Sequence, residues 1–550
     1  MSLDSCLTSD RISAMAAAGL WKDRTLLDHL EAAVASSPDK IAFTAFETAS
    51  GRQTSISYRQ LDRQSRRIAA GLMAMGIGRG DVVSMQLHNC IEFVLVHLAC
   101  LRCGAVTNPL MPFLRHRELS FMLRLAGSKL MIVPRRFRGF DHPAMIAELR
   151  PNLPDLVDCL VVGGEDAAHS FEARLLGRRW EDECDQAALA ARRADPNDVI
   201  EILYTSGTTG EPKGVMHTSN TMLSGVPFFA RRLGLDAQSV VLMASPLAHQ
   251  TGFIYGMVVA IHLGAKCVLQ DVWDPKVAAR LVEDEGVTYT MASTPFLADL
   301  TEEASGGRWD MGTLRVFLSA GAPIPPALVQ RARAVLGAAI LSGWGMTENG
   351  CASSSAIDDP AARSVETDGT AFENMELRIV DGDGNPLPPD TEGRLQARGA
   401  GNFVGYLKRP DLYGVDAGGW FETGDLARMD AAGYIRITGR SKDIIIRGGE
   451  NIPVVEIENV LYRHPAVRDV AIVGYPDQRL GERACAFATL RPGQSLSFAD
   501  MIAFLEEQKV ARQYFPERLR IVDEMPRTPS GKIQKFRLRE VAREPSDQQQ

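Results

Sequence analysis

The chain has 550 residues, of which 45% are hydrophobic and 23% charged, and its formal net charge is −8 at pH 7. This length is too great for one ordinary core, so we expect two or more lobes. The composition is typical of a globular enzyme, and the negative charge argues against a nucleic-acid scaffold, which would carry a basic patch. No apolar run approaches the ~18 residues that span a bilayer. Residues 1–10 carry acids and lack the pattern of a secretory signal, so we expect a cytoplasmic protein.

The nine cysteines, an odd number, do not form a disulfide framework. Cys100 and Cys103 have the spacing of redox and zinc pairs, but no second pair lies nearby in the sequence. They fall in the apolar stretch 91–103, which predicts a buried helix that ends at Gly104. We therefore expect both cysteines to be structural.

A phosphate-binding loop is the next prediction along the chain. The stretch 165–193 is polar and rich in Ala and Arg, which indicates a surface connection, and residues 199–204 read as a buried strand. Hydroxyl and glycine residues then fill positions 205–210, with Lys213 just beyond. Glycines let several backbone N–H groups face one anion, while hydroxyls and a lysine add donors and charge. The spacing differs from the common P-loop. A polyphosphate ligand is favoured, and a flexible surface loop is the alternative if this segment is considered alone.

Strand and helix alternate over the first 440 residues. A strand over 266–270 precedes Asp274, a natural N-cap, and a helix over 276–285 ends at Gly286 before the strand 287–291. The same order recurs with a strand at 314–318 and a helix to about residue 336. Strand–helix–strand units of this length imply parallel pairing, so the fold class is α/β with layered sheets.

After residue 440 the pattern changes. A short helix near 454–463 and a strand over 467–473 indicate a compact α+β module. We therefore expect an N-terminal domain over residues 1–440 and a C-terminal domain over 441–550.

Four further motifs follow the phosphate loop in order. They are Gly321-Ala-Pro323, Gly343-Trp-Gly-Met-Thr-Glu348, Trp420-Phe-Glu-Thr-Gly-Asp425 with Gly439-Arg440, and Pro529-Ser-Gly-Lys532. Together with the segment 204–218, they resemble the motifs of the adenylate-forming enzymes, which include acyl- and aryl-CoA synthetases, luciferases and peptide-synthetase adenylation domains. The resemblance spans roughly residues 25 to 540. It implies a large N-terminal domain of layered β-sheets with flanking helices, followed by a small mobile α+β domain.

The resemblance also implies a reaction in which a carboxylate attacks the α-phosphorus of ATP and pyrophosphate leaves. Bringing two anions together makes charge neutralisation and positioning the main catalytic tasks. The implied catalytic residues are Lys532, Glu348, Thr347 and His249, with Glu348 also holding Mg²⁺. The implied ATP-binding residues are Thr205, Ser206, Gly207, Thr208, Thr209, Gly210, Lys213, Gly321, Ala322, Pro323, Trp344, Thr347, Asp425 and Arg440. In this set Trp344 takes the aromatic place beside adenine, Asp425 accepts the ribose hydroxyls, and Lys532 bridges carboxylate and phosphate.

The second half-reaction needs a nucleophile for the acyl adenylate. No carrier domain follows the C-terminal module, so the resemblance implies free coenzyme A as the acceptor. The small domain is expected to rotate about the hinge residue Lys442 and to present Gly448, Gly449 and Glu450 to the pantetheine. The implied cofactors are ATP, Mg²⁺ and coenzyme A. A homodimer is left open.

The acid is expected to be apolar. His249 is the candidate gate of an acyl pocket, and this region lacks the aspartate with which amino-acid-activating relatives bind an ammonium group. The other expected pocket residues are Gly252, Phe253, Gly343, Gly345 and Met346. The chain is most similar here to cyclohexanecarboxylate-CoA ligases and short- or medium-chain acyl-CoA synthetases. The alternatives are a fatty acyl-AMP ligase feeding an acyl carrier protein, an aryl-CoA ligase, a luciferase-type oxygenase and a nucleotide-sensing descendant without catalysis.

Overall fold

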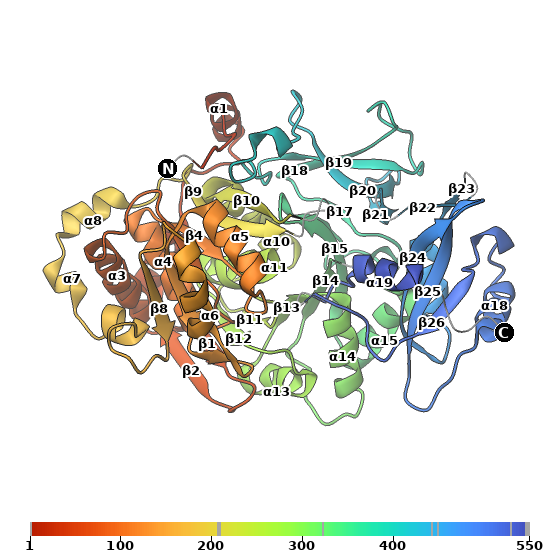
Figure 1. Ribbon diagram of the computed structural model, residues 1–550, viewed down its shortest axis with the longest axis horizontal. Coiled ribbons are helices and arrows are strands. Elements are labelled where there is room, and N and C mark those ends of the chain that lie inside the picture. Colours follow the sequence, from red (N-terminus) through yellow and green to blue (C-terminus); the bar gives the residue numbers. More distant parts are fainter. Residues whose placement is uncertain are drawn as a thin grey trace.

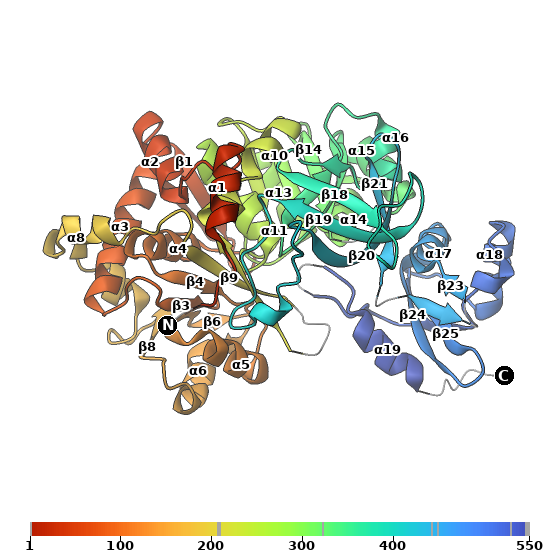
Figure 2. The same cartoon turned by 90° about the horizontal axis from the view of Figure 1, so that it is seen from above.

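The computed structural model describes residues 3–205, 211–321, 324–441, 444–447, 450–528 and 531–544, apart from the side chains at 446, 450 and 451. Several expected site residues lie outside this range: Ser206, Gly207, Thr208, Thr209, Gly210, Ala322, Pro323, Lys442, Gly448, Gly449 and the side chain of Glu450. The chain forms a large N-terminal body and a smaller C-terminal lobe, which lies at the opposite end of the molecule from residues 180–192 (Figures 1 and 2).

Two mainly parallel sheets build the large body. The first comprises β1 (Ile41–Phe46), β2 (Gln53–Ser57), β11 (Val240–Met243), β12 (Lys266–Gln270), β13 (Tyr289–Ala292), β14 (Val316–Ala320), β15 (Ala339–Met346), β16 (Gly350–Ser354) and β17 (Thr370–Ala371), in the order β17-β16-β15-β14-β13-β11-β12-β1-β2. The second comprises β3 (Val82–Met85), β4 (Val106–Pro109), β5 (Ser128–Pro134), β8 (Asp158–Val162), β9 (Val199–Thr205) and β10 (Lys213–Thr218), in the order β10-β9-β4-β3-β5-β8. Antiparallel pairing is confined to the edges.

The sheets and their helices stack in five layers. Helices α2 (Leu26–Ser36), α3 (Tyr58–Ala74), α4 (Ile91–Cys103) and α12 (Val259–Leu263) share one hydrophobic core with the inner faces of both sheets. Helices α13 (Pro275–Glu285), α14 (Thr294–Ala304) and α15 (Pro326–Leu336) cover the outer face of the nine-stranded sheet. Helices α5 (His116–Ala126) and α6 (His142–Leu149) cover the other outer face. Parallel strands with both faces covered explain why these strands are almost continuously apolar.

Local sequence signals predicted the positions of several of these elements correctly. The Asp274 side chain caps α13 by accepting from the Val277 amide at 2.9 Å, and Gly286 ends the helix with a left-handed φ of 66°. Helix α4 is buried along its length and ends at Gly104, as predicted. All nine cysteines are free. The strand expected at 314–318 is β14, which lies two residues further along.

The surface connection expected over 165–193 is mostly exposed or half-buried, but it is more ordered than the sequence indicated. This stretch forms a π-helical turn (Glu172–Leu176) and the helices α7 (Trp180–Glu183) and α8 (Gln186–Arg192). Phe171 and Leu175 are fully buried in the central core. The polar composition masked two apolar anchors that fasten the segment to the body.

A third sheet and the C-terminal lobe complete the fold. The third sheet is antiparallel and comprises β18 (Met375–Val380), β19 (Gly393–Gly399), β20 (Phe421–Met429) and β21 (Ile435–Arg440). The lobe contains β22 (Ile445–Arg447), β23 (Glu450–Ile452), β24 (Val467–Asp477), β25 (Gly481–Leu490) and β26 (Arg518–Ile521) with α17 (Val454–Leu461), α18 (Phe498–Glu507) and α19 (Lys535–Arg543), which confirms an α/β protein with a smaller C-terminal domain. Among the described residues, no helix combines the length and apolar character that crossing a bilayer requires.

Candidate active site

The predicted residues gather at the carboxyl ends of three strands. Strand β9 ends at Thr205, β14 ends beside Gly321, and β15 ends in Gly343–Met346, directly before Thr347 and Glu348. Ligands of open α/β sheets bind at such strand ends. The third sheet adds Asp425 from β20, and the C-terminal lobe adds Lys532 from the loop before α19.

Glu348 is a buried carboxylate, 5% exposed. Its Oε1 accepts a hydrogen bond from the Tyr406 hydroxyl at 2.8 Å. Burial raises the pKa of Glu348, while the Tyr406 hydrogen bond and the charges of Lys213 and Arg440 oppose that rise. A carboxylate in this setting gains from a bound cation, because the cation offsets the cost of burying its charge.

Asp425 is also buried, and both of its carboxylate oxygens have partners. Oδ2 accepts from the Trp344 indole N–H at 2.9 Å, and Oδ1 lies 2.9 Å from Nε of Arg440. Strand pairing sets this geometry, since Asp425 and Arg440 are opposite one another on β20 and β21. Each oxygen has a further lone pair for a hydroxyl donor. Trp344 therefore does more than the sequence indicated: its indole N–H orients the carboxylate, and its ring packs against apolar residues of the third sheet.

Lys532 reaches from the C-terminal lobe into the large body. Its backbone is fixed by hydrogen bonds with Thr528 in both directions. Its Cε lies 3.0 Å from where a side-chain carbon at Gly321 would stand. Burial is the main cause that lowers the pKa of Lys532, Arg440 lowers it further, and Asp425 and Glu348 oppose the change. The lysine therefore lies within electrostatic range of both acidic site residues.

Two glycines are required for this docking. Gly531 has a φ of +83°, and a β-carbon there would overlap Oγ of Ser293, which precedes α14. Gly321, with a φ of +88°, leaves the space that the Lys532 side chain enters. A larger residue at Gly531 would clash with Ser293, and one at Gly321 would displace the end of the Lys532 side chain.

Lys213 and Thr347 flank the same region. Lys213 begins β10, pairs with Thr205 in the strand register, and places its ammonium 4.8 Å from the centre of the Tyr406 ring. Thr347 is partly exposed, and its carbonyl accepts a 2.7 Å hydrogen bond from His217. Neither Tyr406 nor His217 was singled out from the sequence, since each acts through a contact with a distant segment.

His249 lies within electrostatic range of Lys532. Burial and the nearby charge of Lys532 lower the pKa of His249 to about 3, so the imidazole is neutral at neutral pH. Its Nδ1 accepts from the Thr251 amide at 3.2 Å. Phe253 is fully buried, with its ring packed against His97 of α4. The roles of His249 and Phe253 in an acyl pocket remain predictions.

The glycines expected in the acyl pocket are also required by the backbone packing around them. A β-carbon at Gly345 would overlap the carbonyl of Gly350, and one at Gly252 would overlap the carbonyl of Pro246. At Gly343 it would lie 3.1 Å from the carbonyl of Ser353. These positions permit close approach of β15 to β16 and a tight turn before η3 (Phe253–Val258). Their role as a cavity floor, with Met346, remains a prediction, and Gly345→Leu would displace β16.

A metal would need few protein ligands here. Across the described residues, no group of three or more His, Cys, Asp or Glu side chains is arranged to hold an ion. Mg²⁺ is usually bound by one or two carboxylates together with substrate phosphates and waters. The buried Glu348 carboxylate fits that requirement, since Tyr406 holds Oε1 and a carboxylate has a second oxygen that can bind an ion.

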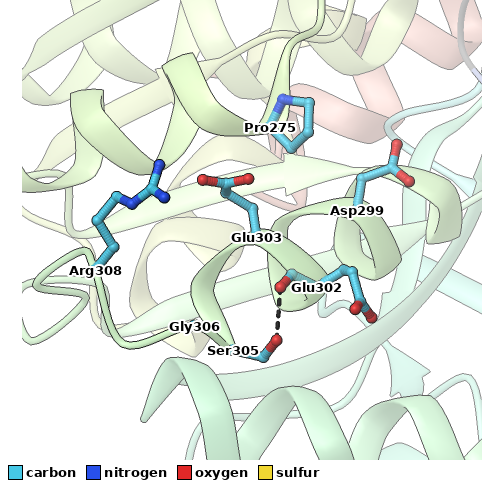
Figure 3. A pocket seen from close by; sticks show the side chains of 7 residues that line it. All are labelled: Pro275, Asp299, Glu302, Glu303, Ser305, Gly306 and Arg308. Atoms are coloured by element: carbon cyan, nitrogen blue, oxygen red, sulfur yellow. Dashed lines mark hydrogen bonds between the residues drawn. The ribbon is translucent and has the colours of Figure 1, made fainter.

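A surface pocket of about 380 Å³ lies elsewhere, between α13 and α14. Figure 3 shows its lining, in which Asp299, Glu302 and Glu303 supply three carboxylates and Arg308 a single cation. Glu303 accepts from the Trp309 indole, and Glu302 pairs with Arg331. None of the predicted site residues lines this pocket, and its negative charge disfavours a nucleotide.

Comparison with known proteins identifies the family. The AMP-binding enzyme family matches residues 30–407, and the C-terminal domain of AMP-binding enzymes matches residues 456–532. The chain is 37% identical to the medium-chain fatty-acid–CoA ligase of Escherichia coli (strain K12), over 95% of this chain and 91% of that protein. It is 34% identical to a salicylyl-CoA synthase / salicylate adenylyltransferase of Streptomyces sp, over 96% of each. The solved structure of the anthranilate CoA ligase AuaEII in complex with anthranoyl-AMP superposes with a TM-score of 0.83 at 26% identity, covering 95% of this chain and 98% of that one.

The chain therefore belongs to the AMP-binding, adenylate-forming enzyme family. It is an AMP-forming acid–thiol ligase of the acyl- and aryl-CoA ligase type, which uses ATP.

Proposed function

We propose that the protein joins an apolar carboxylic acid, medium-chain or alicyclic, to coenzyme A in two steps, with Mg²⁺ held by Glu348. In the first step a carboxylate oxygen bonds to the α-phosphorus of ATP, and the bond to pyrophosphate breaks. In the second, the sulfur of coenzyme A bonds to the acyl carbon, AMP leaves, and the thiol proton passes to solvent.

The observation that carries this proposal is the position of Lys532. It brings a cation from the C-terminal lobe to Gly321, within electrostatic range of Glu348 and Asp425. A lysine in that position can neutralise the carboxylate and the α-phosphate oxygens while they converge, which is the main barrier of the first step. Bound Mg²⁺ would neutralise charge on the phosphate oxygens.

The remaining residues take roles by position. Asp425, oriented by Trp344 and Arg440, accepts hydrogen bonds from the ribose hydroxyls. Lys213 holds the β- and γ-phosphates together with the loop 205–210. His249, neutral and within electrostatic range of Lys532, acts as the gate of the acyl pocket.

An aryl acid is the second candidate substrate. Two of the similar proteins are named for aromatic acids, salicylate and anthranilate. A planar ring and an alicyclic ring differ little in width, so fold and identity alone favour neither.

A panel of acids tests the proposal. Pyrophosphate release is measured with acetate, hexanoate, octanoate, cyclohexanecarboxylate, benzoate and salicylate, with and without coenzyme A, and the nucleotide product is identified by chromatography. We expect AMP, pyrophosphate and a thioester with octanoate or cyclohexanecarboxylate. Preference for benzoate or salicylate would establish the aryl alternative. Acyl-AMP that accumulates with coenzyme A present would indicate a carrier-protein acceptor.

A further inference from the structure

The backbone carbonyls of Thr347 and Glu348 are each fixed by a hydrogen bond from a distant part of the chain. Nε2 of His217 lies 2.7 Å from the carbonyl oxygen of Thr347. A carbonyl only accepts, so Nε2 carries the proton, and Nδ1 is oriented by Thr221 Oγ1 at 3.1 Å. The amide of Phe403 donates to the carbonyl of Glu348 at 2.7 Å.

The Phe403 segment is in turn fixed by Arg11 of the N-terminal helix α1 (Ser9–Ala17). One Nη donates to the Phe403 carbonyl at 2.9 Å and to the Tyr413 hydroxyl at 3.1 Å, and the other donates to the Asn402 carbonyl. The same stretch of chain carries Tyr406, whose hydroxyl holds the Glu348 carboxylate. A guanidinium that makes three such contacts constrains both the backbone and the side chain of Glu348.

We propose that His217 and Arg11 are positioning residues for the metal-binding carboxylate of Glu348. Both act through the Thr347–Glu348 peptide, whose orientation directs the Glu348 side chain toward the cation. The inference rests on the proposed function, since that assigns Mg²⁺ to Glu348. Arg11 lies outside residues 30–407, the stretch that matches the AMP-binding family.

Other metal sites indicate how large the effect of removing His217 or Arg11 should be. Groups that orient a metal ligand change affinity or activity by roughly 10- to 100-fold when they are removed. His217→Leu removes the donor and keeps much of the bulk, so the Mg²⁺ concentration for half-maximal adenylation should rise by roughly that factor. His217→Gln can place its amide nitrogen near the position of Nε2 and should restore most of the loss. Arg11→Met should shift the midpoint in the same direction, and Arg11→Lys should do so less.

Two readouts are needed. The first is ATP–pyrophosphate exchange with the preferred acid over a range of MgCl₂. The second needs no turnover: Mn²⁺ is titrated by electron paramagnetic resonance into each protein with α,β-methylene-ATP bound. Thioester formation from supplied acyl-AMP and coenzyme A, a step without pyrophosphate, should be nearly unchanged in His217→Leu.

His97→Leu is the matched control. His97 is as buried as His217 and is also bonded to a threonine hydroxyl, at 3.0 Å from Thr107, but it lies in α4. It should lower stability and leave both metal midpoints unchanged. Equal Mn²⁺ affinity in wild type, His217→Leu and Arg11→Met would overturn the inference, as would an equal shift in His97→Leu. If His217→Leu does not fold, the Mn²⁺ affinities of Arg11→Met and Arg11→Lys test the inference instead. Wild type that binds no Mn²⁺ with the analogue would refute the role of Glu348 itself, which is a separate outcome.

Discussion

Replacing Lys532 with methionine separates catalysis from stability. Methionine keeps most of the length and apolar stem of the lysine and removes the charge. Loss of a preorganised electrostatic group costs about 3 kcal/mol or more in the transition state. At about 1.36 kcal/mol for each factor of ten, adenylation should fall roughly a hundredfold or more. Thioester formation from supplied acyl-AMP should be nearly unchanged, because the carboxylate and phosphate no longer need to be brought together.

The same substitution should not destabilise the protein. Burial lowers the pKa of Lys532, which means that enclosing its charge costs free energy in the folded state. Lys532→Met removes that cost, so its urea unfolding midpoint should equal or exceed that of wild type. The two half-reactions are assayed by ATP–pyrophosphate exchange and by thioester formation. Equal loss in both, or a lower unfolding midpoint, would show that Lys532 has a structural role.

Three other predictions follow from particular residues. Gly531→Ala should reduce adenylation by more than about tenfold, because it adds a clash with Ser293 to the cost of a left-handed φ; Gly433→Ala, with a φ of +85° and nothing within 4 Å, is the control and should leave exchange unchanged. Burial lowers the pKa of His97 from 6.5 to about 3. As pH falls below 6.5, His97 is therefore protonated in the unfolded chain and stays neutral in the folded protein, which lowers the free energy of unfolding. Between pH 7.5 and 5 wild type should therefore lose about 2 kcal/mol of unfolding free energy relative to His97→Gln, measured by urea denaturation, and a difference independent of pH would contradict this. Octanoate or cyclohexanecarboxylate should exceed acetate by roughly a hundredfold or more in kcat/KM, since each buried methylene contributes ~0.8 kcal/mol, and an enzyme that prefers acetate would show that the pocket is wrongly placed.

Local sequence signals predicted a good part of the fold. The α13 unit could be read from Asp274 and Gly286 because caps and left-handed glycines act over a few residues. Helix α4 could be predicted from a mainly apolar run that ends at a glycine. The five-layer arrangement could not be predicted in this way, because it depends on which faces of two sheets share helices. Phe171 and Leu175 show the limit, since two apolar residues in a polar stretch are enough to anchor it to the central core.

In the candidate site, too, some residues could be predicted from the sequence and others could not. Motif order predicted that Glu348, Asp425 and Lys532 belong to one site, and the structure places them within electrostatic range of one another. The groups that hold them were not predictable from spacing. Tyr406 is 58 positions from Glu348, and His217 is 130 positions from Thr347. Such contacts exist only after distant segments have packed together. A sequence motif therefore predicts the reacting residues but not the residues that hold them in position.

Isotope transfer from the acid tests the central claim most directly. The preferred carboxylic acid is labelled with ¹⁸O in both carboxyl oxygens and incubated with ATP, Mg²⁺ and coenzyme A, and the products are analysed by mass spectrometry. Attack of the carboxylate on the α-phosphorus places one ¹⁸O in AMP, leaves one in the thioester and puts none in pyrophosphate. Label in inorganic phosphate, with ADP as the nucleotide product, would contradict the formation of an acyl adenylate.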